Sequence, residues 1–374
     1  MTLFHALVPA PEGSGAVDWP RIGEAFDWFR RLKDCRQDPV FHAEGDVGIH
    51  TRMVVEALLA DPAWRALERK ARESLFWAAL LHDVAKPATT RLEPNGRVIA
   101  PGHSRRGQIM ARLILMRLGV EFRQREEICH LITHHQVPFF LIDRERPERR
   151  AHLISHQTRC DLLAILASAD ARGRICPDGQ RLLDNIALFR ELCREEACLS
   201  QPKAFASAHS RFLYFRREDR AADYEAFDDW EGEATLLSGL PGAGKDTWLT
   251  GNAAGRAVIS LDDLREERDV DPAGPQGVVI ATAKEQARVL LRAHRPFIWN
   301  ATNVSHQLRS QLIDLFAAYR AKVRIVYLEA PEDEAGRRNR ARVNPVPAGA
   351  IARMRDRWEP PDLTECHRLD VVLT

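Results

Sequence analysis

The segment Gly239-Leu240-Pro241-Gly242-Ala243-Gly244-Lys245-Asp246-Thr247 follows the short apolar run 235–238 and opens an amphipathic stretch at 244–252. Glycines let the main chain approach a phosphate chain closely, and the N–H groups at a helix N-terminus bind anions. The segment therefore predicts a strand, a phosphate-binding loop (P-loop) and a helix, with Lys245 reaching the β- and γ-phosphates of ATP or another nucleoside triphosphate. The predicted nucleotide-binding residues are Gly239, Gly242, Ala243, Gly244, Lys245, Asp246 and Thr247.

The residue after a P-loop lysine is usually Ser or Thr, whose hydroxyl binds magnesium. In this chain it is Asp246, and Thr247 comes one position later. Magnesium is expected to accompany the nucleotide, and either Thr247 or water could complete its ligands in place of the usual hydroxyl.

Beyond the P-loop, short apolar runs alternate with amphipathic stretches to residue 374. The runs predict strands and the stretches predict intervening helices. This alternation is typical of an α/β domain in which helices cover both faces of a parallel sheet. The predicted strands are 235–238, 257–260, 297–300, 323–328 and 369–373, and the predicted helices are 244–252, 278–293, 305–320, 332–342 and 347–357.

Residues 20 to 200 have apolar residues at helical spacing almost throughout, which predicts an all-α domain. A chain of 374 residues is also too long for one typical core. We therefore expect a helical domain at 1–215, a polar linker at 216–232 and the α/β domain at 233–374. The predicted helices of the first domain are 47–60, 71–85, 104–118, 124–135, 159–171 and 180–197, with breaks at Lys86-Pro87, Pro94-Asn95-Gly96 and Pro101-Gly102.

The composition is that of an ordinary globular protein, with a formal net charge of +1. Any contact with nucleic acid must therefore come from local basic patches. The seven cysteines are scattered and form no CxxC pair, so a thiolate zinc site or a disulfide framework is not expected. The sequence has no signal-peptide pattern and no apolar run of membrane-spanning length, which predicts a cytoplasmic protein without a membrane partner.

Polar residues follow the second predicted strand in the order Ser260-Leu261-Asp262-Asp263-Leu264-Arg265. Ligands of parallel sheets sit at the carboxyl ends of the strands. A carboxylate there can accept the proton of an attacking hydroxyl, and an arginine three residues later can grip an acceptor phosphate. The alternative is an Asp pair that only caps a helix.

A basic run, Arg337-Arg338-Asn339-Arg340-Ala341-Arg342, precedes Pro345. Arginines in a mobile segment opposite a P-loop can stabilise charge on a transferring phosphoryl group. A solvated basic helix face is the alternative.

Together, GLPGAGKDTW, LDDLR, the strand end Asn300-Ala301-Thr302-Asn303 and the RRNRAR-x-P run resemble the polynucleotide 5′-kinase branch of P-loop phosphotransferases over about 233–374. The resemblance implies that Asp262 is the general base and that Arg265 holds the acceptor phosphate. It also implies that Arg338 and Arg342 are lid arginines on the donor phosphates, beside the catalytic Lys245. The sequence departs from the family at Asp246, and at Asn300, where relatives often have Asp.

The helical half contains dispersed residues of metal-ligand type, each in or beside a predicted helix with apolar flanks. Burying adjacent His and Asp in an apolar helix is costly unless something pairs with them, and a pair of metal ions does so. Imidazole and carboxylate ligands suit divalent transition metals from manganese to zinc, and two such ions activate water for phosphoester hydrolysis. The candidate ligands are His50, His82, Asp83, His103, His134, His135 and Asp170.

The order H…HD…H…H…D resembles the HD phosphohydrolase superfamily over roughly residues 40–175. The resemblance implies two metal sites that share Asp83. One would consist of His50, His82, Asp83 and Asp170, and the other of Asp83, His103 and either His134 or His135. Lys86, one turn after the HD pair, could steady the substrate phosphate. Asp46, four residues before His50, could be a further ligand or could support one, whereas His42, His152, His156 and His209 fit no position and are expected to be structural.

The two resemblances in this order match bacterial HD–polynucleotide kinase end-healing proteins, and they cover nearly the whole chain. They imply removal of a 2′,3′-cyclic, 2′- or 3′-phosphate by the helical half and phosphorylation of a 5′-hydroxyl by the other. RNA or DNA ends and a nucleoside triphosphate would be the partners, with a separate ligase, because no K-x-D-G adenylation motif is present.

Two alternatives stay open at the sequence level. The first is a kinase for a small molecule or a tRNA-linked group, joined to an HD nucleotidase. The second is a regulatory ATP-binding switch whose HD domain only senses a nucleotide.

Overall fold

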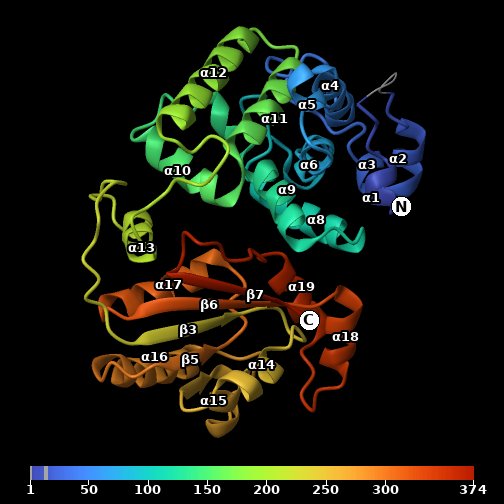
Figure 1. The fold of residues 1–374 in the computed structure, drawn as a ribbon. Helices are drawn as coiled ribbons and strands as arrows, with labels where there is room; N and C mark the ends of the chain where they lie inside the picture. The colour runs from blue at the N-terminus through green and yellow to red at the C-terminus, as the bar shows by residue number, and fades with distance from the viewer. Residues whose placement is uncertain (1, 12–15) are drawn as a thin grey trace. The chain divides into compact units, whose positions relative to one another are not determined.

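The computed structural model describes residues 2–11 and 16–374 of the chain. Two compact units, Met1–Ala204 and Phe205–Thr374, make up the chain, and each is described by itself (Figure 1).

The first unit is built from helices, as the hydrophobic spacing predicts. Each helix expected from that spacing is present, with its ends shifted by a few residues at most places. The short helix α7 occupies the predicted break at Lys86-Pro87, and Pro94-Asn95-Gly96 forms the turn of a small hairpin. The elements are α1 (Leu3–Ala6), α2 (Trp19–Ala25), α3 (Asp27–Arg30), α4 (Val47–Ala60), α5 (Pro62–Arg65), α6 (Arg69–Leu81), α7 (Lys86–Thr89), β1 (Arg91–Leu92), β2 (Val98–Ile99), α8 (His103–Arg117), α9 (Phe122–His134), η1 (Val137–Phe139), α10 (Pro147–Gln157), α11 (Cys160–Arg172) and α12 (Gly179–Glu195).

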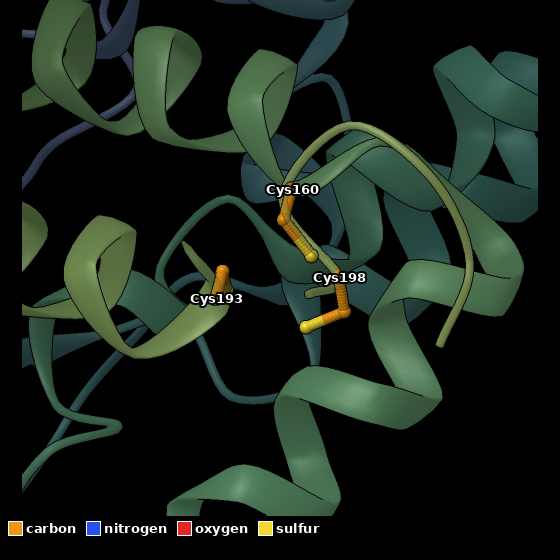
Figure 2. Close-up of side chains that lie close together, drawn as sticks. All are labelled: Cys160, Cys193 and Cys198. Atoms are coloured by element: carbon orange, nitrogen blue, oxygen red, sulfur yellow. The ribbon is translucent and has the colours of Figure 1, made fainter. Parts of the chain in front are cut away.

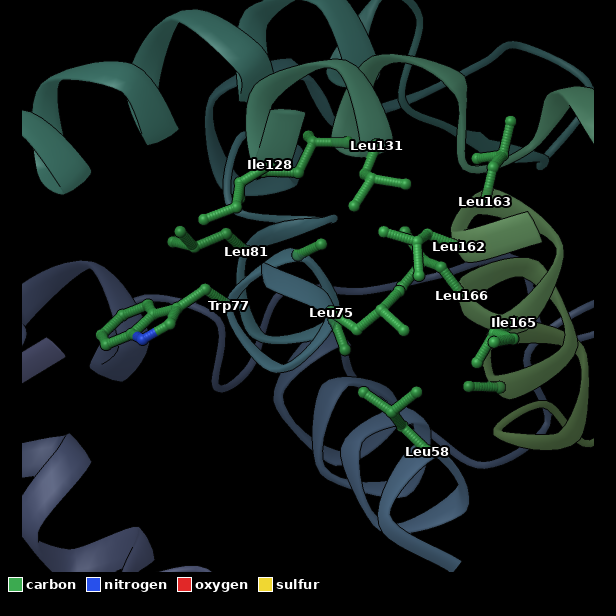
Figure 3. Packing of buried hydrophobic residues seen from close by; sticks show 14 of the residues in the cluster. Leu58, Leu75, Trp77, Leu81, Ile128, Leu131, Leu162, Leu163, Ile165 and Leu166 are labelled. Atoms are coloured by element: carbon green, nitrogen blue, oxygen red, sulfur yellow. The ribbon is translucent and has the colours of Figure 1, made fainter. Parts of the chain in front are cut away.

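Helix α6 lies at the centre of this unit. Almost every residue from Ala71 to Leu81 is buried, because the second half of the helix is apolar on all sides. Helices α4, α9 and α11 pack around it. Figure 3 shows this packing between Leu75, Trp77 and Leu81 of α6 and Leu58, Ile128, Leu131, Leu162 and Leu166 of its neighbours. The packing holds the end of α6, where His82 and Asp83 follow, inside the unit.

The second unit is an α/β domain with a parallel five-stranded sheet in the order β4-β5-β3-β6-β7. Both the class and the five predicted strands are confirmed. The central strand β3 runs into the P-loop. The strands are β3 (Glu233–Ser238), β4 (Ala257–Ser260), β5 (Phe297–Asn300), β6 (Lys322–Glu329) and β7 (Arg368–Leu373), and the helices are α13 (Ala208–Arg216), α14 (Lys245–Asn252), α15 (Leu261–Glu267), α16 (Gly277–Arg292), α17 (His306–Ala318), α18 (Glu332–Arg340) and α19 (Ala348–Arg355).

Side chains that alternate along the strands build an apolar layer on each face of this sheet. Leu236 of β3 and Trp299 of β5 join a cluster with helices α13, α16 and α17. Leu237 and Ile298, one residue along each strand, join a second cluster with α14. The sheet is therefore covered on both faces, and its open edge is the one formed by the carboxyl ends of the strands.

The boundary between the units differs from the predicted one. Helix α13 falls within the predicted helical domain, yet it packs on the α/β unit. The ring of Phe212 stacks on His367 with 4.1 Å between centroids, and the guanidinium of Arg211 donates to the carbonyl groups of Cys366 and His367 at 3.1 and 3.0 Å. These contacts place the division at 204/205 instead of inside 216–232.

A histidine pair lies beneath α13, with His209 buried and His367 half-buried. The Nδ1 atom of His367 accepts a hydrogen bond from the backbone N–H of Val323 at 3.0 Å, so its proton is on Nε2. That Nε2–H donates to Nδ1 of His209 at 3.1 Å. Burial lowers the pKa of His367 to about 3 and also lowers the pKa of His209. Both rings are therefore neutral in the folded protein at neutral pH.

A histidine whose pKa is lowered in the folded protein destabilises the fold in acid, because the unfolded chain takes up the proton at a higher pH than the folded protein does. Between pH 7 and pH 5, His367 alone should lower the free energy of unfolding by about 2 kcal/mol, given an unfolded pKa of about 6.5. The variant His367→Asn keeps an acceptor for Val323 but does not titrate. Urea unfolding at both pH values should show that the wild type loses about 2 kcal/mol more than this variant. Equal losses would contradict a neutral His367, since the two proteins differ in titration only at this ring and at His209, which it contacts.

Candidate functional site

Six of the predicted ligands gather inside the first unit and form the histidine–aspartate cluster: His50, His82, Asp83, His103, His135 and Asp170. All are buried, and they come from α4, the end of α6, α8, the end of α9 and α11. Residues more than 100 positions apart in sequence thus meet at one place.

Three of these histidines are oriented by the same kind of hydrogen bond to the backbone. The Nδ1 atom of each lies next to the carbonyl oxygen three residues earlier: Ala79 at 2.8 Å for His82, Ala100 at 2.7 Å for His103, and Ile132 at 2.7 Å for His135. A carbonyl can only accept, so each Nδ1 carries the proton. Each Nε2 is therefore left with the lone pair that can bind a metal.

The Nε2 atoms point toward the carboxylates. His50 Nε2 lies 3.2 Å from Asp170 Oδ1, and His82 Nε2 lies 3.2 Å from Asp83 Oδ2. His103 Nε2 approaches the other oxygen of Asp83 at 3.5 Å. The ligand atoms of two sets lie within 4.8 Å of one another, namely His50, His82, Asp83 and Asp83, His103, His135. Asp83 is common to both sets, as expected of a carboxylate between two metal ions.

Two observations indicate that the cluster fits cations. His82 Nε2 and His50 Nε2 lie only 3.3 Å apart, a contact that needs a positive charge or a proton between the two nitrogens. In the described part of the chain, His135 Nε2 and both oxygens of Asp83 are buried without an aligned hydrogen-bond partner. Neutral imidazoles and carboxylates in this arrangement suit divalent transition metals.

The electrostatics of the cluster set the charge of its ligands. Burial opposes protonation of His50, but its contacts with Asp170 and Glu44 together outweigh burial and raise the pKa of that ring. Burial opposes ionisation of Asp83 and Asp170, but it is outweighed at Asp83 by Lys86 together with the neighbouring histidines, and at Asp170 by Arg174 together with histidines. Both pKa values therefore lie well below the usual range. Burial lowers the pKa of His135 to about 3 and also lowers the pKa of His103. The carboxylates are therefore charged and these two imidazoles neutral.

Two cations lie beside the carboxylates. Lys86 Nζ is 2.7 Å from Asp83 Oδ2 and donates to Gln37 Oε1 at 2.7 Å. Arg174 forms a bidentate pair with Asp170 at 2.9 and 2.7 Å. In this structure both cations are paired with ligands, so contact with a substrate phosphate would require them to share or exchange these partners.

The structure separates the two adjacent histidines that the sequence left undecided. His135 lies in the cluster, whereas His134 does not. His134 Nε2 is 2.7 Å from Gln157 Oε1, and its Nδ1 is 3.4 Å from an Arg150 nitrogen. Inclusion of His134 among the ligands is therefore not supported. Successive helical side chains point about 100° apart, and here that turn directs His134 toward Gln157 and His135 toward the cluster.

Glu44 is a residue that the sequence analysis missed. Its carboxylate is almost fully buried, with Oε1 at 3.0 Å from His50 Nδ1 and at 2.8 Å from His42 Nδ1, and with Oε2 accepting from the Ile175 N–H at 2.9 Å. It therefore shares His50 Nδ1 with the carbonyl oxygen of Gly173, which lies at 3.1 Å. Asp46 instead caps α4 by accepting from the Ile49 N–H at 2.9 Å, so it is not a ligand here. Glu44 lies in a loop without periodicity, and no sequence signal marks it.

In the second unit, the predicted nucleotide-binding residues form the P-loop at the carboxyl edge of the sheet. Gly242 and Gly244 have φ angles of +81° and +94°, which only glycine adopts readily. A Cβ on Gly242 would lie 2.2 Å from the Ala335 carbonyl oxygen. Lys245 Nζ donates to the carbonyl oxygens of Gly239 and Leu240 at 2.9 and 3.0 Å. Burial lowers the pKa of Lys245 to about 8.

The predicted lid and acceptor residues face the P-loop. Arg338 and Arg342 line the same pocket of about 170 Å³ as Lys245, Asp246 and Thr247. One nitrogen of Arg342 is 3.4 Å from Asp246, and the other is 3.5 Å from Asp262. The arginine thus spans from the donor side to the predicted base.

Asp262 itself is solvent-accessible, with 70% of its side chain exposed. It lies in the first turn of α15 and pairs with Arg265, whose Nε donates to Gln276 at 2.7 Å. Ser260, not Asp262, is the N-cap of α15, since its hydroxyl accepts from the Asp263 N–H. The side chain of Asp262 is therefore available for chemistry.

The strand-end motif 300–303 contributes to the base of the P-loop. The carbonyl of Thr302 accepts from the Gly239 N–H at 2.8 Å, and the Asn303 amide donates to the Leu237 carbonyl at 2.7 Å. Asn300 reaches Asp246 at 3.5 Å. These contacts fix the start of the P-loop and connect the unusual Asp246 to the neighbouring strand.

Comparison with protein families also separates a first, helical domain from a second, α/β domain. Residues 47–169 match the HD domain, and residues 235–361 match an AAA domain.

The chain joins an HD domain to a P-loop kinase-like domain. In the described residues, none of the helices is long and apolar enough to cross a membrane.

Two curated relatives, both called multifunctional CCA protein, come from Actinobacillus pleuropneumoniae serotype 5b (strain L20) and serotype 7 (strain AP76). Each is 30% identical to this chain over 160 residues, which is 40% of this chain and 36% of the relative. The chain thus spans little more than a third of the length of these relatives.

Solved structures with similarity include a candidate kinase from Chloroflexus aurantiacus (16% identity, 39% of this chain and 87% of that one, TM-score 0.34). A Pnkp1/Rnl/Hen1 complex gives 18% identity over 33% of this chain and 44% of that one, with a TM-score of 0.29. The APS kinase CysC of Mycobacterium tuberculosis, in complex with AMPPNP and APS, is 17% identical over 38% of this chain and 88% of that one, with a TM-score of 0.27. At these scores the likenesses carry no argument about activity.

The contact of Glu44 with His50 can be tested through metal affinity. Replacing a carboxylate that orients a ligand histidine typically costs about 10- to 100-fold in metal affinity. We expect Glu44→Gln to weaken Mn²⁺ binding by such a factor, measured by the paramagnetic resonance signal of free Mn²⁺. Asp46→Asn is the matched control, because an Asn cap is nearly equivalent to Asp. An unchanged affinity in Glu44→Gln would remove Glu44 from the site.

The two adjacent histidines provide a second test. His135→Ala should lower the number of Mn²⁺ ions bound per chain, because one of the two ligand sets loses an imidazole. His134→Ala should bind as many ions as the wild type. The reverse result would show that the ligand is His134 and that the ring seen here turns away from its working position.

Proposed function

We propose that this protein heals nucleic-acid ends, with a 5′-hydroxyl kinase in the second unit and a metal-dependent 2′,3′-phosphoesterase in the HD domain. The observation that carries the proposal is the arrangement of Asp262, Arg342 and the P-loop around one pocket. An exposed carboxylate facing a P-loop across an arginine suits transfer of a phosphoryl group to a hydroxyl that arrives from solvent.

In the kinase, the P-loop N–H groups and Lys245 hold the β- and γ-phosphates, for which Lys245 exchanges its two carbonyl partners. Asp262 accepts the proton of the 5′-hydroxyl, and Arg265 binds the adjacent phosphate of the acceptor strand. Arg338 and Arg342 turn to the donor phosphates and offset the charge that develops on the transferred group. Thr247 and Asp246 would lie on the magnesium side of the triphosphate, where the bound ion would supply further neutralisation of its charge.

In the HD domain, the two ligand sets would hold a pair of divalent ions, which supply an acidified water and neutralise the phosphate. His50, His82 and Asp170 would hold one ion, His103 and His135 the other, and Asp83 both. Lys86 reaches the same carboxylate and is placed to bind a phosphate oxygen. The substrate would be a 2′,3′-cyclic, 2′- or 3′-phosphate, and a separate ligase would seal the healed ends.

A second candidate is a kinase for a small molecule joined to an HD nucleotidase. The exposure of Asp262 favours a large acceptor over one that must be enclosed, because a small substrate is usually buried in its pocket. Activity on free nucleosides and none on a strand would favour this candidate instead.

The test uses a short RNA with a 5′-hydroxyl and a 2′,3′-cyclic phosphate, incubated with ATP, Mg²⁺ and Mn²⁺. We expect the wild type to change both ends. Asp262→Asn should lower 5′-phosphorylation by about 10²- to 10⁴-fold, as loss of a general base does, and leave the other reaction intact. Asp263→Asn, one residue along the same turn, is the control and should phosphorylate at the wild-type rate.

His82→Ala should show the opposite pattern, with loss of phosphate release and normal 5′-phosphorylation, resolved on the same gel. Loss of both activities in either variant would contradict two independent sites. RNA unchanged at both ends by the wild type would rule out a nucleic-acid substrate of this kind.

A further inference from the structure

A second group of metal-ligand type lies in the helical unit, outside the histidine–aspartate cluster. The Sγ atoms of Cys160, Cys193 and Cys198 lie within 4.8 Å of one another, and all three residues are fully buried. Figure 2 shows these side chains, which we call the three-cysteine cluster, converging from the start of α11, the end of α12 and the segment after α12. Neither proposed activity uses them.

The backbone at the end of α12 brings two of the thiols together. Ala197 has a φ angle of +51°, a left-handed conformation that a non-glycine residue rarely adopts. It turns the chain so that the Cys198 N–H donates to the Cys193 carbonyl at 2.8 Å, the bond that closes a Schellman motif. In such a motif the two residues joined by this bond also bring their side chains together. Cys193 and Cys198 are therefore neighbours because of how the helix ends.

The third thiol is delivered by a separate contact. The Asp161 N–H donates to the Leu199 carbonyl at 2.9 Å, which ties the segment after α12 to the first turn of α11. Cys160 is the first residue of that helix. The positive end of a helix dipole favours a thiolate, so this position suits a metal-binding sulfur.

Further polar groups lie in the neighbouring chain. His152 Nε2 is 2.9 Å from Glu196 Oε2, and Glu196 precedes Cys198 by two residues. Lys203 Nζ donates to the same Glu196 oxygen at 2.9 Å.

We propose that the three-cysteine cluster is a structural zinc site, with Cys160, Cys193 and Cys198 as thiolate ligands. Structural zinc sites are closed and rich in thiolates, which matches the complete burial of the three sulfurs. Zn–S bonds of about 2.3 Å require sulfurs about 3.8 Å apart, so closure from the observed separation needs only a small contraction. Three thiolates also prefer zinc to the harder ions that suit the histidine–aspartate cluster.

The site would act as a clamp in the helical unit. It joins the beginning of α11 to the end of α12, and α11 carries Asp170 near its other end. Its role does not depend on the proposed activities, and it contains no residue of the histidine–aspartate cluster.

The experiment uses the full chain, purified in reductant without chelator and then incubated with zinc chloride, followed by removal of unbound zinc. Zinc per chain is measured by plasma mass spectrometry in the wild type, in Cys160→Ser and in Cys129→Ser, a buried cysteine outside the cluster. We expect Cys160→Ser to lose one zinc equivalent and Cys129→Ser to lose none. The same zinc content in both variants would overturn the proposal.

Two measurements on the wild type keep the proposal testable if Cys160→Ser does not fold. Cobalt chloride in place of zinc should give intense sulfur-to-cobalt charge-transfer absorption, which nitrogen and oxygen ligands do not produce. An organomercurial that reacts with thiols should release one zinc equivalent to a coloured chelator. A cobalt protein without charge-transfer absorption, or a disulfide between two of these cysteines in a non-reduced digest of the zinc-treated protein, would overturn the zinc assignment.

Discussion

Asp83 is only 1% exposed and lies where the central helix of the first unit, α6, ends. A lone carboxylate in such a place would cost several kcal/mol, and the arrangement of its neighbours reflects that cost. Lys86 and His82 come from the same turn of chain, while His103 is brought by α8. Packing of α4, α9 and α11 around α6 then places the remaining ligands within reach of Asp83. The packing that forms the core therefore also brings the candidate metal ligands together.

Much of the architecture could be predicted because it depends on local pattern. Strands β4 and β5 have the predicted ends, since runs such as 257–260 and 297–300 are apolar and bounded by polar residues. The P-loop was visible because its chemistry requires glycines at fixed spacing. Helix α13 was assigned to the wrong unit, because its partners Cys366 and His367 lie about 150 residues away and nothing local reveals them.

The candidate site was predictable in type and not in detail. Which of His134 and His135 faces the ligands depends on where α9 ends, and one residue of difference turns the side chain by about 100°. Glu44 and the three-cysteine cluster could not be found from spacing at all. Glu44 lies in an irregular loop, and the thiols meet only because Ala197 takes a left-handed conformation. The absence of CxxC spacing was a sound reason to expect no thiolate site, but it excludes only local ones.

Lys245 donates two hydrogen bonds to carbonyl oxygens of the P-loop itself, so these carbonyl groups compete with any bound anion for the lysine. An anion that enters must replace two good carbonyl acceptors before it gains anything from the ammonium group. The ammonium group is therefore already satisfied within the loop, and binding of an anion there is an exchange of partners, not the filling of an unmet need.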